Sequence, residues 1–240
     1  MSTSSSVWAL VPAAGVGSRM ASCHPKQYLM LRDKPVIRHT LERLAQLDML
    51  AGIYVGISAS DQYWEEIMAD VDAINDKPVR AYVGGRERAD TVLNGLAALA
   101  RVAGDSDRVL VHDAARPCVR TEDINELVLR VGTQADGGLL ALPVADTVKR
   151  AGADQRCTET VPRDGLWRAL TPQFFPISHL RAALKTALER GESITDEASA
   201  MELAGFAPQL VIGHSDNIKI THPEDLRMAG FYLDMQERLT

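Results

Sequence analysis

The chain alternates between short apolar runs and longer stretches in which apolar residues recur three or four positions apart. Continuous apolar runs are typical of parallel strands covered on both faces of a sheet. The runs that we expect as strands are Val7–Val11, Ile53–Ile57, Val79–Val83, Val109–Val111, Leu139–Leu142 and Leu210–Ile212. Residues spaced i, i+4 and i+7 predict amphipathic helices between them. These sets are Ile37, Leu41 and Leu44; Val92, Leu96 and Leu99; and Ile124, Val128 and Val131.

This alternation of strands and helices predicts the fold class. We expect an α/β fold with a doubly wound, mostly parallel sheet, built as one domain over residues 1–240. Ligands of such sheets bind beyond the carboxyl ends of the strands. The residues that directly follow the strands are therefore the first candidates for a functional site.

One segment, residues 146–164, breaks the alternation. Its sequence, DTVKRAGADQRCTETVPRD, reads as two polar strand-like pieces joined around Ala151–Asp154. An isolated two-stranded hairpin is marginal in water, so the segment is either a surface excursion or a β-arm that docks on a second subunit. We favour a protruding dimerisation arm, because Val148 and Val161 need cover.

Charge and composition narrow the possible partners. The chain has 26 Lys and Arg against 32 Asp and Glu, a formal net charge of −6. Proteins that bind nucleic acid are usually basic, so we expect no nucleic-acid partner, whereas a small polyanion can bind where cations converge on one pocket. No run approaches the length of a membrane span, about 18 residues. Three distant cysteines indicate neither disulfides nor zinc. We expect a cytoplasmic protein without membrane contact.

The first expected strand leads into a loop of small residues, PAAGVGSRM. Gly15 and Gly17 permit a tight turn, so that backbone amides can approach phosphate groups closely. Alone, such a turn is weak evidence, and ordinary turn geometry explains it equally well. Arg19 in the loop and Lys26 just beyond it strengthen the phosphate hypothesis, because two cations beside a Gly-rich turn suit a triphosphate.

Two further strands end in candidate ligand residues. Asp113 follows the fourth expected strand and could hold Mg²⁺ against phosphate oxygens, or it could cap the next turn. We expect its neighbour His112 to be packed rather than catalytic. The stretch 84–91, GGRERADT, follows the third expected strand. It could close over a nucleobase or serve only as a turn from strand to helix.

Taken in order, the motifs resemble those of one family. The matching stretches are PAAGVGSRM, PKQYL, GGRERADTV, VHDAARP, PVADTVKR, GLWRALTPQFF, ITDEASA and DNIKIT, which span Pro12 to Thr221. In these stretches the chain is similar to the 2-C-methyl-D-erythritol 4-phosphate cytidylyltransferases of the non-mevalonate isoprenoid pathway. An ordered set over nearly the whole chain is far more specific than a Gly-rich loop alone.

The resemblance implies a Rossmann-like nucleotidyltransferase that transfers CMP from CTP to 2-C-methyl-D-erythritol 4-phosphate and releases pyrophosphate, with Mg²⁺. It implies a CTP site formed by Pro12, Ala13, Ala14, Gly15, Gly17, Gly85, Thr91, Asp113 and Ala114, with Asp113 also near the metal. The implied catalytic residues are Arg19, Lys26, Arg163 and Lys219, and the implied acceptor-binding residues are Arg116, Thr147, Thr171 and Thr195. It further implies a homodimer with exchanged arms, in which Arg163 serves the neighbouring site.

Three other functions remain open at this point. A ribitol 5-phosphate cytidylyltransferase would share the fold, although DTVKR and ITDEAS look more like the erythritol enzymes. A NAD-dependent dehydrogenase would also use a doubly wound sheet, but Met20 stands at the third position of the Gly-x-Gly-x-x-Gly pattern. A non-catalytic nucleotide-binding module would have no need for three convergent cations.

Overall fold

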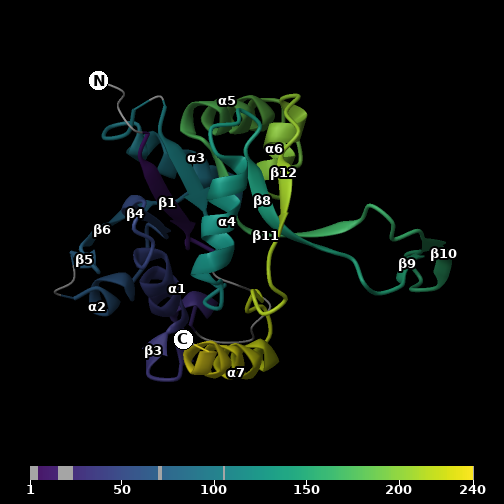
Figure 1. Ribbon diagram of the computed structural model, residues 1–240, viewed down its shortest axis with the longest axis horizontal. Helices are drawn as coiled ribbons and strands as arrows, with labels where there is room; N and C mark the ends of the chain where they lie inside the picture. The colour runs from purple at the N-terminus through teal and green to yellow at the C-terminus, as the bar shows by residue number, and fades with distance from the viewer. Residues whose placement is uncertain (1–4, 16–23, 70–71, 105, 240) are drawn as a thin grey trace.

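The structure, a computed structural model, describes residues 5–15, 24–69, 72–104 and 106–239. Eight strands form one sheet in the spatial order β12-β8-β11-β7-β1-β4-β6-β5 (Figure 1). They are β1 (Val7–Pro12), β4 (Leu50–Ile57), β5 (Ala73–Ile74), β6 (Lys77–Val83), β7 (Arg108–Val111), β8 (Gly138–Pro143), β11 (Trp167–Pro176) and β12 (Gln209–Ile212). The six apolar runs expected as strands all lie in this sheet and run in one direction, and β5 and β11 run against them. The doubly wound, mostly parallel sheet is confirmed.

Helices cover both faces of the sheet, because the strands are apolar on both sides. In β1, Val7, Ala9 and Val11 pack on the face that α1 and α4 cover, and Leu10 packs under α3, α5 and α6. Fully burying one such Leu or Val side chain stabilises the fold by about 1.5–3 kcal/mol. The helices are α1 (Val36–Ala45), α2 (Trp64–Ile67), α3 (Arg88–Leu99), α4 (Thr121–Val131), α5 (Ile177–Glu189), α6 (Glu197–Leu203) and α7 (Pro223–Leu239).

Short elements and the last helix complete the body. A 3-10 turn, η2 (Lys26–Tyr28), precedes the small pair of strands β2 (Met30–Leu31) and β3 (Lys34–Pro35). Helix α7 lies apart from the sheet, at the bottom of Figure 1, and packs against β2 in a separate apolar cluster. In the part of the chain that the structure describes, every helix is too short or too polar to cross a membrane.

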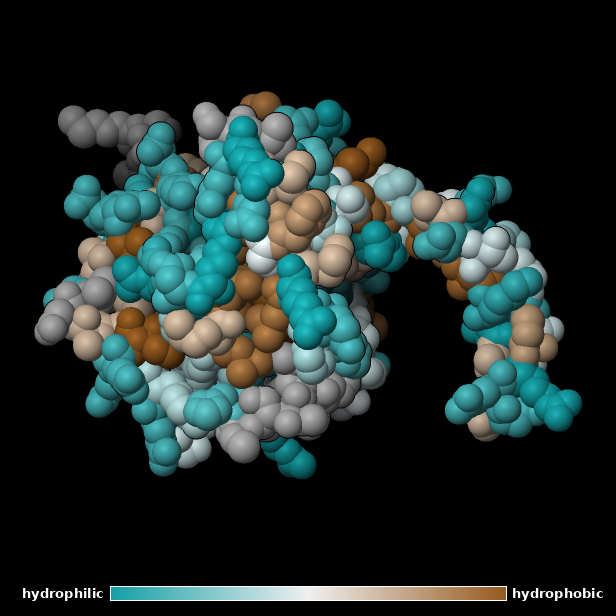
Figure 2. Space-filling view, turned by 90° about the horizontal axis from the view of Figure 1, so that it is seen from below, coloured by the Kyte–Doolittle hydropathy of each residue, from teal (hydrophilic) through white to brown (hydrophobic). Residues whose placement is uncertain are grey.

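The segment 146–164 forms a hairpin that projects from the body. Its strands β9 (Val148–Ala151) and β10 (Cys157–Val161) pair antiparallel, with Val148 opposite Val161. Figures 1 and 2 show the hairpin standing clear of the sheet, beyond the ends of β8 and β11, with hydrophilic residues over its tip. The predicted arm is therefore confirmed as an element, and what it docks against remains a prediction.

The strand order reverses beside β1, and this reversal places the functional loops. The chain adds β4 and β6 on one side of β1 and then returns to its other side with β7. The loops that follow β1 and β7 consequently leave the same edge of the sheet next to each other. The first begins at Ala13, whose N–H donates to the carbonyl of Gly56 at 2.7 Å, and the second begins at His112, whose N–H donates to the carbonyl of Leu10 at 2.9 Å.

Strand β11 is the longest strand and lies between β7 and β8, antiparallel to both. Its pairing with β8 is irregular between Ala169 and Gln173, around Pro172. Proline cannot donate to a strand ladder and is tolerated at such irregularities, which often re-aim a side chain at a functional site. Thr171 lies within this irregular stretch, and its hydroxyl contacts the loop after β7.

Candidate active site

Two adjoining pockets open at the strand reversal, on either side of Asp113. The first has a volume of about 160 Å³ and lies between the loops that follow β1, β6 and β7. The second has a volume of about 270 Å³ and lies against β11 and the start of α6. Three charged residues, Arg88, Asp113 and Lys219, line both pockets and form the wall between them.

The structure brings most of the predicted site residues together around these pockets. The first pocket is lined by the predicted residues Pro12, Ala13, Ala14, Gly15, Lys26, Gly85, Thr91, Asp113, Ala114 and Lys219. The second is lined by the predicted residues Asp113, Arg116, Thr171, Thr195 and Lys219. Gly17 and Arg19 lie outside the described residues, so their roles remain predictions.

Gln27, for which the sequence predicted no role, holds the loop after β1 in place. The buried amide of Gln27 donates to the carbonyls of Ala13 at 2.7 Å and Gly15 at 3.2 Å. Next to it, the Lys26 ammonium donates to the carbonyl of Ile220 at 3.1 Å. These bonds fix the small-residue loop and direct a cation toward the first pocket.

The opposite wall of the first pocket is the loop between β6 and α3. A Cβ atom added to Gly84 would lie 2.5 Å from the Cβ of Ala14, so glycine is needed for the two loops to touch. The hydroxyl of Thr91 donates to the carbonyl of Glu87 at 3.0 Å and accepts the N–H of Gly85, also at 3.0 Å. Thr91 therefore shapes this loop from a buried position, and its contact with a cytosine base remains a prediction.

Asp113 is the electrostatic centre of the site, because three cations converge on its buried carboxylate. Arg88 Nε lies 3.1 Å from Oδ1, and Lys219 Nζ and Arg116 Nε lie 2.9 and 3.3 Å from Oδ2. Burial alone would raise the pKa of Asp113, but the three positive charges outweigh burial and hold it well below its usual range. Asp113 is thus an anion at neutral pH that orients cations toward both pockets.

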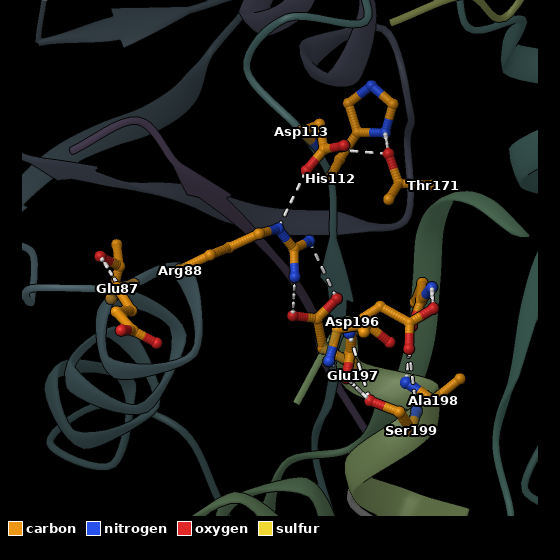
Figure 3. Close-up of polar contacts among 12 residues, drawn as sticks. Glu87, Arg88, His112, Asp113, Thr171, Asp196, Glu197, Ala198 and Ser199 are labelled. Carbon is orange, nitrogen blue, oxygen red and sulfur yellow. Dashed lines mark hydrogen bonds and ion pairs between the residues drawn. The ribbon is translucent and has the colours of Figure 1, made fainter. Parts of the chain in front are cut away.

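Arg88, which is half-buried, and Glu197, which is buried, form a second ion pair beside Asp113 (Figure 3). The two terminal nitrogens of Arg88 lie 2.6 and 3.0 Å from the two carboxylate oxygens of Glu197, a bidentate geometry. Burial raises the pKa of the Glu197 carboxyl, and the positive charge of Arg88 opposes that rise. Burial lowers the pKa of Arg88, but the negative charges of Glu197 and Asp113 outweigh burial and raise that pKa above its usual value. Both residues lie within the matching motifs GGRERADTV and ITDEASA, but from the sequence alone neither is predicted to have a role.

Thr171 and His112 complete the inner layer of the site. The Thr171 hydroxyl accepts the backbone N–H of Asp113 at 3.1 Å and lies 2.9 Å from His112 Nδ1, and His112 Nε2 lies 3.1 Å from the carbonyl of Arg116. Burial lowers the pKa of His112 to about 4. His112 is therefore a neutral, packed side chain, as the sequence predicted, and it holds the loop that carries Asp113.

The structure separates two predicted residues from both pockets. Thr147 and Arg163 are both exposed at the base of the arm, where Arg163 donates to the carbonyl of Ala145. Neither side chain is among the described residues that line these two pockets. Their contacts with an acceptor remain predictions.

A divalent cation has few protein ligands available here. The described residues contain no cluster of three or more Asp, Glu, His or Cys side chains that could hold a metal ion. Asp113 is the one described carboxylate that lines both pockets. Mg²⁺ in phosphoryl-transfer sites typically takes one or two carboxylates and completes its shell with phosphate oxygens and water. The donor set therefore fits a magnesium ion that is held mainly by the substrate.

A doubly wound sheet with a small-residue loop at the strand reversal, beside convergent cations, defines a Rossmann-like protein that binds a nucleotide at this edge. The sequence model of the family described as 2-C-methyl-D-erythritol 4-phosphate cytidylyltransferase matches residues 7–235. The chain belongs to this family of nucleotidyltransferases.

Relatives and solved structures agree with the family match. The enzyme of that name from Shewanella amazonensis is 49% identical over 240 residues, covering 100% of this chain and 98% of the relative. The one from Vibrio vulnificus is 48% identical, covering 97% and 96%. Among solved structures, the enzyme from Francisella tularensis has a TM-score of 0.81 at 31% identity, covering 95% of this chain and 100% of that chain. A crystal structure of a 4-diphosphocytidyl-2C-methyl-D-erythritol synthase has a TM-score of 0.83 at 37% identity, covering 96% and 99%.

Proposed function

We propose that this protein transfers the cytidylyl group of CTP to 2-C-methyl-D-erythritol 4-phosphate and releases pyrophosphate. The observation that carries the proposal is the pair of pockets that share Arg88, Asp113 and Lys219 as a common wall. A nucleotide in the first pocket and a phosphate acceptor in the second would meet at that wall. The family match favours this reaction over the ribitol phosphate and dehydrogenase alternatives.

The reaction needs no general base from the protein. A phosphate monoester has a second pKa of about 6 and is largely a dianion at neutral pH, so its oxygen can attack the α-phosphorus of CTP directly. The new bond joins that oxygen to the α-phosphorus, the bond from the α-phosphorus to the bridging oxygen breaks, and pyrophosphate leaves with its electron pair. This agrees with His112, which is buried, neutral and engaged with Thr171.

The main barrier is repulsion between the dianion and the triphosphate. Lys26 lines the first pocket, Arg116 lines the second, and Lys219 lines both. Positive charges fixed before the reaction stabilise developing charge more than mobile water does. Asp113 keeps Lys219 and Arg116 in place, since its Oδ2 atom contacts both. Arg19 belongs to the same proposed set by its place in the family motif.

The proposed reaction includes a site for Mg²⁺. Asp113 is the residue that would hold it, together with phosphate oxygens. When bound, the ion would neutralise charge on the triphosphate and polarise its oxygens.

The arm is proposed to complete the site of a second subunit. Thr147 and Arg163 line neither pocket of their own chain, and the exposed hairpin stands clear of the body (Figure 1). An isologous dimer would place each arm against its partner's second pocket. We also expect the protein in the cytoplasm.

Complementation tests the exchanged arm. Lys219→Met damages the body of a site, and Arg163→Ala damages the arm. If arms are exchanged, a mixed dimer of the two variants contains one intact site. Statistical mixing of the two impaired variants should then restore about a quarter of wild-type activity. A mixture that stays as inactive as its components, with mixed dimers verified by mass, would exclude the exchange.

Parallel turnover assays test the reaction itself. Pyrophosphate release is measured with CTP and either 2-C-methyl-D-erythritol 4-phosphate or ribitol 5-phosphate, and NADH binding is titrated separately. We expect turnover with the erythritol phosphate to exceed that with ribitol phosphate at least about tenfold, which corresponds to 1.4 kcal/mol of discrimination. Preference for ribitol phosphate, or tight NADH binding without CTP turnover, would refute the proposal.

A further inference from the structure

Arg88 lies at the start of a helix and lines both pockets. It is the first residue of α3, directly after the loop that lines the first pocket, and its side chain reaches across to the second pocket. Figure 3 shows the guanidinium between two carboxylates, Asp113 from the loop after β7 and Glu197 from the start of α6. One planar group therefore connects three elements that are distant in sequence.

The backbone around Glu197 is held by contacts that do not involve Arg88. Asp196, the residue before it, caps α6 by accepting the N–H of Ser199 at 2.9 Å. The amide of Gln173, from β11, donates to Asp196 at 2.9 Å and accepts the N–H of Ala198 at 2.8 Å. The carboxylate of Glu197 thus projects from a rigid helix start, and it is 1% exposed.

The terminal nitrogens of Arg88 and its Nε atom contact different carboxylates. Glu197 takes the two terminal nitrogens and fixes the plane of the guanidinium, so that Nε is directed at Asp113 Oδ1. With Oδ1 occupied, Asp113 presents only Oδ2 to Lys219 and Arg116. Without that contact, the Asp113 carboxylate could rotate, and both of its oxygens would compete for the two cations that face the second pocket.

We propose that Arg88 and Glu197 are a positioning pair, which fixes the Asp113 carboxylate and thereby the cations of the acceptor pocket. The fork of arginine is required, because lysine is a point charge that cannot bind Glu197 in bidentate fashion and reach Asp113 as well. The pair acts through Asp113, so its loss affects the acceptor more than the nucleotide. Arg116, one of the two cations that Asp113 orients, lines only the second pocket.

The inference rests on the proposed function, and wild-type turnover of CTP with the erythritol phosphate separates the two. If the wild-type protein shows no turnover, the proposed reaction is wrong. The role of the pair is then tested by calorimetry, which compares acceptor binding by the wild-type protein and the variants. The variants are Arg88→Lys, Glu197→Gln and their combination. The control is Arg43→Leu, which breaks the 2.8 Å contact of Arg43 with Gln236 away from both pockets.

We expect each single variant to lower kcat about 10- to 100-fold, in the range of one lost transition-state contact, and to raise the acceptor KM about fivefold or more. The KM for CTP should change less than threefold. The double variant should be no worse than Arg88→Lys, because neighbours in contact are not additive. The affinity for the acceptor, measured by calorimetry, should fall by about the same factor as its KM rises.

Several results would overturn the inference. A merely structural pair would lower kcat in proportion to the folded fraction and leave both KM values and acceptor affinity unchanged, as Arg43→Leu should. Wild-type kinetics in Arg88→Lys would contradict the need for a fork. Fully multiplicative losses in the double variant would show that the two residues act separately.

Discussion

Replacement of Lys219 by methionine tests the shared wall of the two pockets most sharply. The Lys219 ammonium lies 2.9 Å from Asp113 Oδ2 and lines both pockets. A phosphate whose charge lies about 4 Å from it would gain about 4 kcal/mol at an effective dielectric constant of about 20. The Lys219 side chain is 39% exposed and also shared with Asp113, so screening reduces this gain. The net stabilisation of the transition state by Lys219 is therefore about 2–3 kcal/mol.

Each 1.36 kcal/mol is a factor of ten in rate, so Lys219→Met should lower kcat/KM about 30- to 200-fold. Methionine keeps the length of the side chain, and Asp113 retains Arg88 and Arg116 as partners, so the fold should persist. The assay is pyrophosphate release under saturating CTP, with unfolding followed by circular dichroism. Lys185→Met, on the exposed face of α5, is the matched control and should be unaffected. A folded Lys219→Met enzyme within threefold of wild type would refute the electrostatic reasoning.

The remaining predictions concern the inner layer of the site and its nearest cation. Lys26→Ala should lower kcat by about 10² or more with the fold intact, and near-normal turnover would remove Lys26 from the mechanism. Thr171→Val removes the hydroxyl that accepts a hydrogen bond from the backbone N–H of Asp113. It should destabilise the protein by about 1–3 kcal/mol in urea unfolding, and an unchanged midpoint would contradict that. For His112, the folded pKa of about 4 lies below the unfolded value of about 6.5, so the unfolded state binds more protons between these values. Stability should fall by about 3 kcal/mol as pH drops from about 6.5 to about 4, and His112→Gln should lack this part of the slope. An identical slope in the variant would assign the effect elsewhere.

The parallel part of the fold was accessible from the sequence because each of its strands is a short apolar run bounded by turns. Strand β11 was not, since Trp167 and Arg168 precede its apolar residues and Pro172 interrupts them. A pattern that ends at a proline does not indicate a central strand. The sheet accommodates Pro172 in the middle of β11 because the register of β11 with β8 is irregular there, and this irregularity is visible only in the paired strands.

The site residues likewise divide into those that a local sequence pattern predicts and those that only tertiary packing brings together. Residues that directly follow β1, β6 and β7 could be found because parallel strands end at one edge. Arg88 and Glu197 sit at the first positions of two helices, 109 residues apart, where a charged residue is an ordinary choice. No local pattern joins them, and their pairing follows from the packing of α3 and α6 on one face of the sheet.

We propose that the two pockets bring CTP and a phosphate acceptor together at the wall formed by Arg88, Asp113 and Lys219. The most direct measurement is ³¹P NMR of the purified protein with CTP, Mg²⁺ and 2-C-methyl-D-erythritol 4-phosphate. We predict that the acceptor phosphate resonance is replaced by those of a cytidine diphosphate conjugate, with one pyrophosphate released for each acceptor consumed. Pyrophosphate release without a conjugate, or no change in the acceptor resonance at full occupancy of CTP, would contradict the account.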